Sequence, residues 1–378
     1  MSNTIPVIDD LRDYIEFILS LNRMTFIDVM MEKLRSNLVL VGVSREQAEE
    51  ISKRRTFVEY AEYITEKHKD LLDNDVESIQ NQLLELAEKA SKQSKLQKDS
   101  NLSPSDSSVG DKISKDVTFF YRGQYDSSKG MKTGIYRGHT YKREDYLYHE
   151  MLVRCSEEFR NTTHIEKLAI MQHYGCPTRL FDITLNPLVA LYFACKNYRC
   201  KTCNSVDEGI VYIFQVESNE MVYADSDRAL ILSCLPRFSI SDKHDMIRTS
   251  VSNLRSGGFP KNKDGIYTDS VIERLYHEIC REVPAFKRSI VPLDLLQPLF
   301  VQPEKSNRRM MKQDGAFILT GLSSDGFEEQ AKLELMSNVS VRIKDKEKIL
   351  KQLERIGINE ATLFPEMEHV AGYLKERY

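Results

Sequence analysis

Apolar residues near the N-terminus recur at helical spacing, which predicts a helical region over residues 1–92. A first helix covers residues 13–21, where the apolar side chains fall on one face. Residues 44–47 read Ser-Arg-Glu-Gln, a capping-box pattern that opens a second helix. Residues 93–114 are rich in Ser, Asp, Lys and Gly and have no apolar periodicity, so we expect a flexible linker there.

Beyond the linker, strand-like and helix-like runs alternate, which is typical of an α/β (α+β) fold. Runs rich in β-branched and aromatic residues predict buried strands at residues 117–121, 209–216, 315–319 and 339–343. Helical periodicity predicts a helix over residues 269–283 and two closing helices after the last strand. We expect one α/β domain over residues 115–322, completed by a C-terminal strand and helices over residues 323–378.

A short connection between two apolar helices holds an unusual number of polar side chains. The first helix opens with a capping box at Thr163 and Glu166 and ends at Gly175. The second begins with Asn186 as N-cap and Pro187 at its first position. Packed helices at both ends would hold these polar groups on a rigid scaffold, so we expect a site here. The polar residues are His173, Tyr174, Thr178, Arg179, Asp182, Thr184 and Asn186.

A second polar group ends the strand predicted at residues 117–121. Arg122 and Gln124 are two residues apart, so they share one face of that strand. Gly123 between them lacks a side chain, which leaves room for the close approach of a ligand. A buried Arg122 needs an anionic partner. That partner is either a ligand or a carboxylate of the protein such as Asp182.

These segments, together with a third at residues 309–317, resemble the motifs of FRG-domain proteins, a family named after a Phe/Tyr-Arg-Gly turn. Arg309 and Gln313 of the third segment lie four apart on one helical face. With the tail at residues 344–378, the resemblance covers about 260 residues in several separate motifs. The matching motifs are Tyr121-Arg-Gly-Gln124, Gln172-His-Tyr-Gly-x-Pro-Thr-Arg-Leu-x-Asp-x-Thr184 and Arg309-x-x-x-Gln313-x-Gly315-x-Phe317.

Proteins of this family recur in bacterial toxin and antiphage-defence settings. The layout of the domain is similar to that of ADP-ribosyltransferases, whose split sheet grips NAD. The resemblance therefore implies a split-sheet ADP-ribosyltransferase-like domain that transfers ADP-ribose from NAD, its substrate, to a protein or nucleic acid. A non-enzymatic nucleotide-binding sensor or interaction module is the alternative.

The resemblance also implies roles for individual residues. Arg122 and Arg179 would clamp the pyrophosphate, and Tyr174 would face the nicotinamide ring. Transferases of this type usually carry a late catalytic Glu, but this chain has Gln313-Asp-Gly315, so Asp182 or Glu150 would supply the carboxylate. A structural polar core network is the competing interpretation. The expected catalytic residues are Arg122, His173, Asp182 and Gln313, and the expected NAD-binding residues are Tyr121, Gln124, Tyr174, Thr178, Arg179, Thr184 and Arg309.

Composition bears on the location and the partners of the protein more than on its chemistry. The net charge of −4 gives no global basic field, although a local basic patch could still bind RNA or DNA. The N-terminus lacks a signal-peptide pattern and the chain lacks a long apolar run, so we expect a cytoplasmic protein without a membrane partner. Cys195, Cys200 and Cys203 form only half of a zinc motif, so we expect no metal.

Two further segments indicate a protein partner and a mobile loop. The apolar stripe of the helices in residues 1–92 is a natural dock for a protein partner, either an antitoxin or a second copy of the chain. Residues 250–269 are rich in Gly and contain a Pro. We expect them to form a mobile loop that covers a site or meets that partner.

Overall fold

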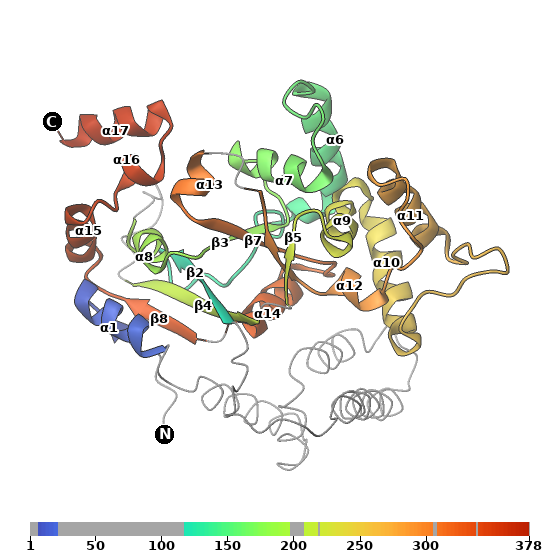
Figure 1. Cartoon of the computed structure of the whole chain (residues 1–378), viewed down its shortest axis with the longest axis horizontal. Coiled ribbons are helices and arrows are strands. Elements are labelled where there is room, and N and C mark those ends of the chain that lie inside the picture. The colour runs from blue at the N-terminus through green and yellow to red at the C-terminus, as the bar shows by residue number, and fades with distance from the viewer. Residues whose placement is uncertain are drawn as a thin grey trace, which may run out of the picture.

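A mixed eight-stranded sheet forms the centre of the protein (Figure 1). The computed structural model describes residues 7–21, 117–196, 208–217, 220–304, 308–337 and 339–377. The strand order is β1-β8-β4-β2-β3-β7-β6-β5, with parallel pairs at the two edges and antiparallel pairs between them. The strands are β1 (Val7–Ile8), β2 (Val117–Gln124), β3 (Leu180–Thr184), β4 (Gly209–Glu217), β5 (Met221–Tyr223), β6 (Leu299–Gln302), β7 (Gly315–Leu319) and β8 (Val339–Ile343).

Two halves of this sheet meet at β2 and β3. β2 pairs with β4 along its whole length, and β3 pairs with β7 along its whole length. Between β2 and β3, by contrast, the described residues pair at Tyr121 and Thr184 alone. All eight described strands therefore belong to one sheet, but β2 and β3 separate from each other beyond their single paired position.

Helices cover both faces of the sheet (Figure 1), and the described part of the chain also has three short 3-10 helices in the connections. The α-helices are α1 (Leu11–Leu21), α6 (Glu144–Arg154), α7 (His164–His173), α8 (Pro187–Cys195), α9 (Asp227–Ser233), α10 (Ile240–Asn253), α11 (Ser270–Glu282), α12 (Pro292–Leu296), α13 (Arg308–Lys312), α14 (Gly326–Met336), α15 (Lys346–Arg355), α16 (Glu360–Leu363) and α17 (Met367–Arg377). The 3-10 helices are η2 (Thr140–Arg143), η3 (Leu235–Arg237) and η4 (Leu254–Ser256).

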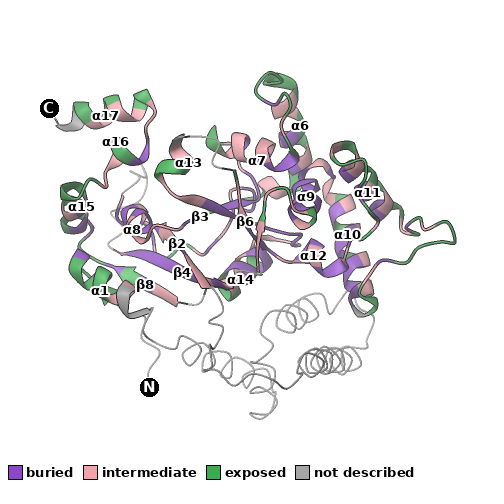
Figure 2. Cartoon of the chain, viewed as in Figure 1, coloured by how far each residue is buried: buried purple, intermediate pink, exposed green. Residues whose placement is uncertain are grey.

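Strand alternation sorts the apolar residues into three buried clusters. One cluster packs α1, α8 and α15 against the β2–β4–β8 half, and Tyr121 belongs to it. A second packs α6, α7 and α9 to α12 against the β3–β7–β6 half. The third lies on the opposite face under α14 and includes Phe120. Figure 2 shows this arrangement as a buried centre with exposed outer helices.

Gly123 allows α8 to lie directly on β2. A Cβ at Gly123 would stand 1.7 Å from the carbonyl oxygen of Ala190, and one at Gly209 of the neighbouring strand would stand 2.2 Å from that of Ala194. Such distances are far inside van der Waals contact. The expectation that Gly123 makes room for a ligand is therefore corrected, because the space is filled by the backbone of α8.

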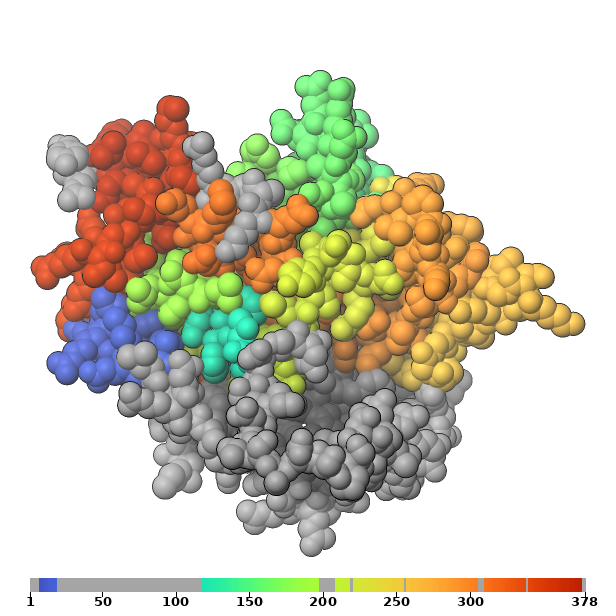
Figure 3. Space-filling view, viewed as in Figure 1, coloured from blue at the N-terminus to red at the C-terminus, as the bar shows by residue number. Residues whose placement is uncertain are grey.

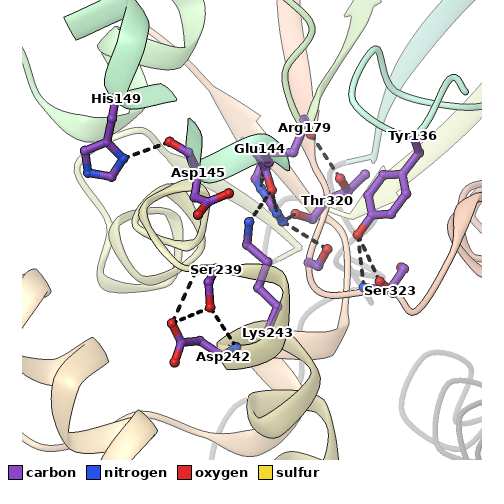
Figure 4. Close-up of polar contacts among 11 residues, drawn as sticks. Tyr136, Glu144, Asp145, His149, Arg179, Ser239, Asp242, Lys243, Thr320 and Ser323 are labelled. Atoms are coloured by element: carbon purple, nitrogen blue, oxygen red, sulfur yellow. Dashed lines mark hydrogen bonds and ion pairs between the residues drawn. The ribbon is translucent and has the colours of Figure 1, made fainter. Parts of the chain in front are cut away.

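A buried ion network joins four segments that are distant in sequence (Figure 4). Arg179, completely buried, donates from Nε and Nη2 to the two carboxylate oxygens of Glu144 at 2.9 and 2.5 Å. Lys243 of α10 donates to the same carboxylate at 2.8 Å. Arg179 Nη1 donates to the carbonyl oxygens of Thr320 and Gly321. Burial alone would raise the pKa of Glu144, but the charges and hydrogen bonds of Arg179 and Lys243 lower it to about 2.

Most of the predicted elements within the described residues are confirmed. The capping box of Thr163 and Glu166 opens α7, Asn186 caps α8, and Gly175 adopts a left-handed conformation with φ of 82°. The strands predicted from apolar runs are β2, β4, β7 and β8. Residues 7–21 join the same fold, since β1 pairs with β8. The second helix predicted from residue 44 and the linker over residues 93–114 lie outside the described residues.

Two expectations about element boundaries are wrong. α10 continues to Asn253, four residues into the loop expected over residues 250–269, because its buried face extends to Ser250 and Val251. The tail contains three helices rather than two, since α16 forms around its own capping box at Asn359 and Thr362.

We predict that Gly123→Ala destabilises the fold by about 1–3 kcal/mol or more, because α8 must move away from β2. Urea denaturation of the full chain measures the loss. Gly258→Ala is the matched control, since a Cβ at Gly258 would meet no atom within 4 Å. Equal stability of the two variants would contradict the close packing of α8 on β2.

We predict that Glu144→Gln costs about 3–5 kcal/mol at neutral pH, because it leaves the buried Arg179 and Lys243 without their counter-ion. The folded pKa of Glu144 is depressed from 4.5 to about 2, so the stabilisation is complete above pH 4.5 and is lost as the pH falls towards 2. Melting temperatures across this range should show the wild type and the variant converging at low pH. Glu150→Gln on the same helix, which breaks only the exposed pair with Arg154, should change little.

Candidate functional site

A cavity of about 940 Å³ lies where β2 and β3 separate. Its walls come from these two strands, the loop after β2, and from α7, α8, α13, β7 and α14. Because Tyr121 and Arg122 alternate along β2, they face opposite sides of the sheet, and both line the cavity. Figure 3 shows the surface hollowed between the C-terminal helices and α6, in the region where α7 and α13 lie.

Most of the site residues predicted from the sequence line this cavity. They come from the three separate motifs, so the fold does bring those motifs together. Tyr174, Thr178 and Arg179 are predicted site residues that do not line it. The cavity-lining residues among the predictions are Tyr121, Arg122, Gln124, His173, Asp182, Thr184, Arg309 and Gln313.

Arg122 spans the opening between the two strands. Its Nη1 donates to the backbone carbonyl oxygen of Asp182 at 2.5 Å and lies 3.8 Å from the carboxylate oxygen Oδ2 of the same residue. Its guanidinium stacks on the ring of Phe181, 3.9 Å from the centroid. Arg122 therefore contacts the Asp182 carboxylate and also faces the cavity. It can keep this protein partner and still bind an anionic ligand.

Asp182 is positioned by its own motif. Its Oδ1 accepts a hydrogen bond of 2.5 Å from Nε2 of Gln172, and Oε1 of Gln172 accepts one of 2.7 Å from the hydroxyl of Thr178. The Asp182 side chain is 63% exposed, so its carboxylate remains open to the cavity. Thr178 is buried and acts as a support for Gln172 rather than as a ligand-binding residue.

Three expected roles need correction. The guanidinium of Arg179 is wholly engaged with Glu144 and two carbonyl oxygens, away from the cavity, so Arg179 cannot clamp a phosphate there. Tyr174 is 68% exposed outside the cavity, with its ring packed on that of His173. Glu150 pairs with Arg154 on α6 and is not among the described residues that line the cavity, so it is not placed to act as the missing carboxylate there. His173, exposed at the end of α7, does line the cavity.

Aromatic rings elsewhere can take the place of Tyr174. Tyr121, Tyr125, Phe193 and Phe317 all line the cavity. Tyr121 is buried, and burial raises its pKa to about 12, so its phenol stays protonated. A flat heterocycle would find apolar ring faces in this part of the cavity.

Hydrogen bonds tie the third motif to β3 and to the C-terminal helices. The hydroxyl of Thr184 donates to the carbonyl oxygen of Gln313 at 2.6 Å, and the side-chain amide of Gln313 donates to the carbonyl oxygen of Leu363 at 3.0 Å. Arg309 lies over the ring of Phe364 at 4.6 Å. The positions of Arg309 and Gln313 in the cavity wall therefore depend on the packing of α16.

The loop after β2 supplies charge that the sequence analysis missed. Besides Arg122 and Arg309, its residues Lys129, Lys132 and Arg137 line the cavity. Asp182 is the single carboxylate among the described residues that line it. Five cations against one carboxylate make the cavity strongly attractive to anions. The signal was present, since residues 127–143 contain five Lys or Arg and no Asp or Glu.

The helix α14 and Gln124 hold this loop in place. Glu329, fully buried, accepts hydrogen bonds from the backbone and hydroxyl of Thr133. Lys132 lies 4.7 Å from the ring centroid of Phe327. The side-chain amide of Gln124 donates to the carbonyl oxygens of Asp126 and Lys129, so Gln124 shapes the turn that presents the cations.

The described residues offer no group of three metal-ligating side chains. Cys195 is buried, and burial raises the pKa of its thiol to about 12, which disfavours the thiolate that zinc requires. Cys200 and Cys203 lie outside the described residues. Within the described part of the chain, no helix has the length and apolar character needed to cross a membrane.

Comparison with known proteins supports the resemblance read from the motifs. A search of curated proteins and a search of solved structures each find no match, so the ADP-ribosyltransferase-like layout gains no support from a solved relative. The family model of the FRG domain matches residues 117–203. This range holds β2, the loop after it with Lys129, Lys132 and Arg137 (the cationic loop), α6, α7, β3 and α8. It therefore includes most of the residues that line the cavity. The chain therefore contains an FRG domain over residues 117–203.

Proposed function

We propose that the cavity binds NAD and that the protein transfers ADP-ribose from it to a macromolecule, as a bacterial toxin or antiphage-defence effector. The observation that carries this proposal is the strong positive charge of a large cavity between β2 and β3. Its volume lies within the range of about 300–1,000 Å³ typical of small-molecule sites. NAD combines two flat rings with a pyrophosphate, which suits aromatic walls flanked by cations.

Arg122 is the residue best placed to hold the pyrophosphate. Its guanidinium is fixed against Phe181 and Asp182, so little side-chain freedom is lost when it binds an anion. Lys129 and Arg137 face the same cavity and replace Arg179 as the second phosphate contact. Tyr121 and its aromatic neighbours replace Tyr174 as the surface for nicotinamide.

The transfer needs a carboxylate and a base. The bond between nicotinamide and C1′ of the ribose breaks with its electron pair going to nicotinamide, and the positive charge left on the ribose is stabilised by the Asp182 carboxylate. A nucleophile of the acceptor then bonds to C1′ and gives up its proton. His173 at the end of α7 is the proposed acceptor of that proton, and Gln313 orients the ribose.

A second candidate function is a non-enzymatic nucleotide sensor. Asp182 is the single carboxylate among the described cavity residues, and it already accepts a hydrogen bond from Gln172 and lies near Arg122. These contacts reduce the negative charge available to a ribose cation. The release of nicotinamide by the purified chain separates the two candidates, because a sensor binds NAD without releasing it.

A protein partner remains part of the proposal. The helices expected to bind an antitoxin or a second copy fall mostly in residues 22–92, outside the described residues. The loop expected over residues 250–269 contributes no residue to the described lining of the cavity, so the partner remains the role proposed for it.

We predict that Arg122→Ala lowers NAD turnover by about 10²–10³-fold, because a preorganised donor to the developing charge is lost. Growth inhibition in a bacterial host should be lost with it. Arg274→Ala is the matched control, since Arg274 forms an exposed pair with Asp242 outside the cavity. A folded Arg122→Ala variant that keeps full turnover would rule out this residue as the clamp.

We predict that Asp182→Asn binds NAD with nearly wild-type affinity but releases nicotinamide at least about 10²-fold more slowly, since only the charge is removed. The asparagine oxygen can still accept the hydrogen bond from Gln172, so the melting temperature should change little. Calorimetric titration and chromatographic detection of nicotinamide give the two quantities. Unchanged release would show that Asp182 is not the catalytic carboxylate.

A further inference from the structure

The segment between β2 and α6 is basic over its whole length. Residues 127–143 hold five Lys or Arg and no Asp or Glu, although the whole chain has a net charge of −4. The acids on either side are occupied, since Asp126 pairs with Lys129 and Glu144 is buried with Arg179. Solvent therefore meets mainly positive charge along this segment.

Three cations of this segment line the cavity, and the other two follow them in the chain outside it. Lys129, Lys132 and Arg137 line the cavity. Lys142 and Arg143 follow in η2, and both are exposed. Lys142 is five residues from Arg137, a separation that an extended chain could not stretch beyond about 18 Å. We call these five residues the basic strip.

Aromatic rings accompany the outer part of the basic strip. Tyr141 is half-buried and stacks on Tyr136, with ring centroids 5.3 Å apart and an interplanar angle of 21°. Tyr146 is 56% exposed, and the guanidinium of Arg143 lies 5.6 Å from its centroid. Cations interleaved with accessible rings are the combination that holds a phosphate backbone while unpaired bases stack.

The charge of the strip exceeds what NAD alone requires. A pyrophosphate carries two negative charges, whereas the cavity has five cations against one carboxylate, and Lys142 and Arg143 add two cations outside it. A polyanion bound beside NAD would pair with the cations that the pyrophosphate leaves unpaired. A protein acceptor offers no regular array of negative charge that would match such a strip.

We propose that the basic strip binds single-stranded nucleic acid, which is the acceptor for the ADP-ribose. This inference rests on the proposed function of the cavity. The strand follows the strip to the cavity, where a nucleophilic nitrogen or oxygen of the strand bonds to C1′ of the ribose. The bond from C1′ to nicotinamide breaks as before, and His173 takes the proton of the nucleophile. Single strands are favoured over duplexes because a duplex keeps its bases stacked away from Tyr141 and Tyr146.

Charge reversal tests the strip directly. The full chain is titrated with short fluorescent single-stranded DNA and RNA of mixed sequence, and binding is followed by anisotropy over a series of salt concentrations. The test variant is K142E/R143E, which lies outside the cavity lining. An acidic residue is also favourable at the start of α6, so the fold should tolerate the change. The matched control is K263E/K287E, which reverses two charges that are also exposed and lie elsewhere.

The expected result is weaker binding by K142E/R143E alone. The slope of log affinity against log salt should fall by about 1.4, since each lost phosphate contact on a single strand removes about 0.7. A wild-type chain that binds no oligonucleotide, or a test variant that binds as well as the control, overturns the proposal.

A second readout identifies the acceptor. Labelled NAD is added to the wild-type chain together with the oligonucleotide and host proteins, and label is expected on the nucleic acid. Label on protein alone overturns the acceptor assignment while leaving the transferase proposal intact. Oligonucleotide binding that the K142E/R143E change abolishes, in a chain that neither binds nor cleaves NAD, supports the strip and contradicts the proposed function instead.

Discussion

The opening between β2 and β3 is the constraint on which the rest of the site depends. An antiparallel pair in the middle of a sheet normally exchanges backbone hydrogen bonds along its length, but here the described residues of the two strands pair at Tyr121 and Thr184 alone. Beyond that point the guanidinium of Arg122 donates to the carbonyl oxygen of Asp182. A side chain thus satisfies a backbone acceptor that a ladder bond would otherwise fill. The opening exposes Arg122 and Asp182 to the cavity, and the neighbouring strand pairs keep the two halves of the sheet in place.

Some polar side chains of residues 172–184 lie at the cavity, and others are buried in the core. Gln172 and Thr178 form a hydrogen-bonded support under Asp182. Arg179 points the other way and fixes α6 and α10 to the sheet through Glu144 and Lys243. Part of this segment is therefore the polar core network around Arg179, and another part, around Asp182, lines the cavity. The rigid buried network also holds the start of β3, so the geometry of Asp182 depends on residues that never touch a ligand.

Local signals in the sequence were sufficient for much of the fold and for most of the cavity. Capping residues and strand composition depend on neighbours a few positions away, so they could be read directly. Arg179 was misassigned because its carboxylate partner Glu144 lies 35 residues away, and Lys243, which shares that carboxylate, lies 64 residues away on the other side. Lys129, Lys132 and Arg137 were missed because a charged loop is usually solvated, and here α14 folds back to hold it against the cavity. The clash that makes Gly123 necessary likewise depends on where α8 packs.

The central claim is that the gap between the two halves of the sheet is a nucleotide site. Crystallographic determination of the chain with NAD tests it most directly, using the Asp182→Asn variant to slow turnover. The account predicts that the pyrophosphate lies against Arg122 and the cationic loop, with a ring of NAD against the aromatic residues of the cavity. Binding of NAD at another surface, or an empty cavity at saturating NAD, would contradict it.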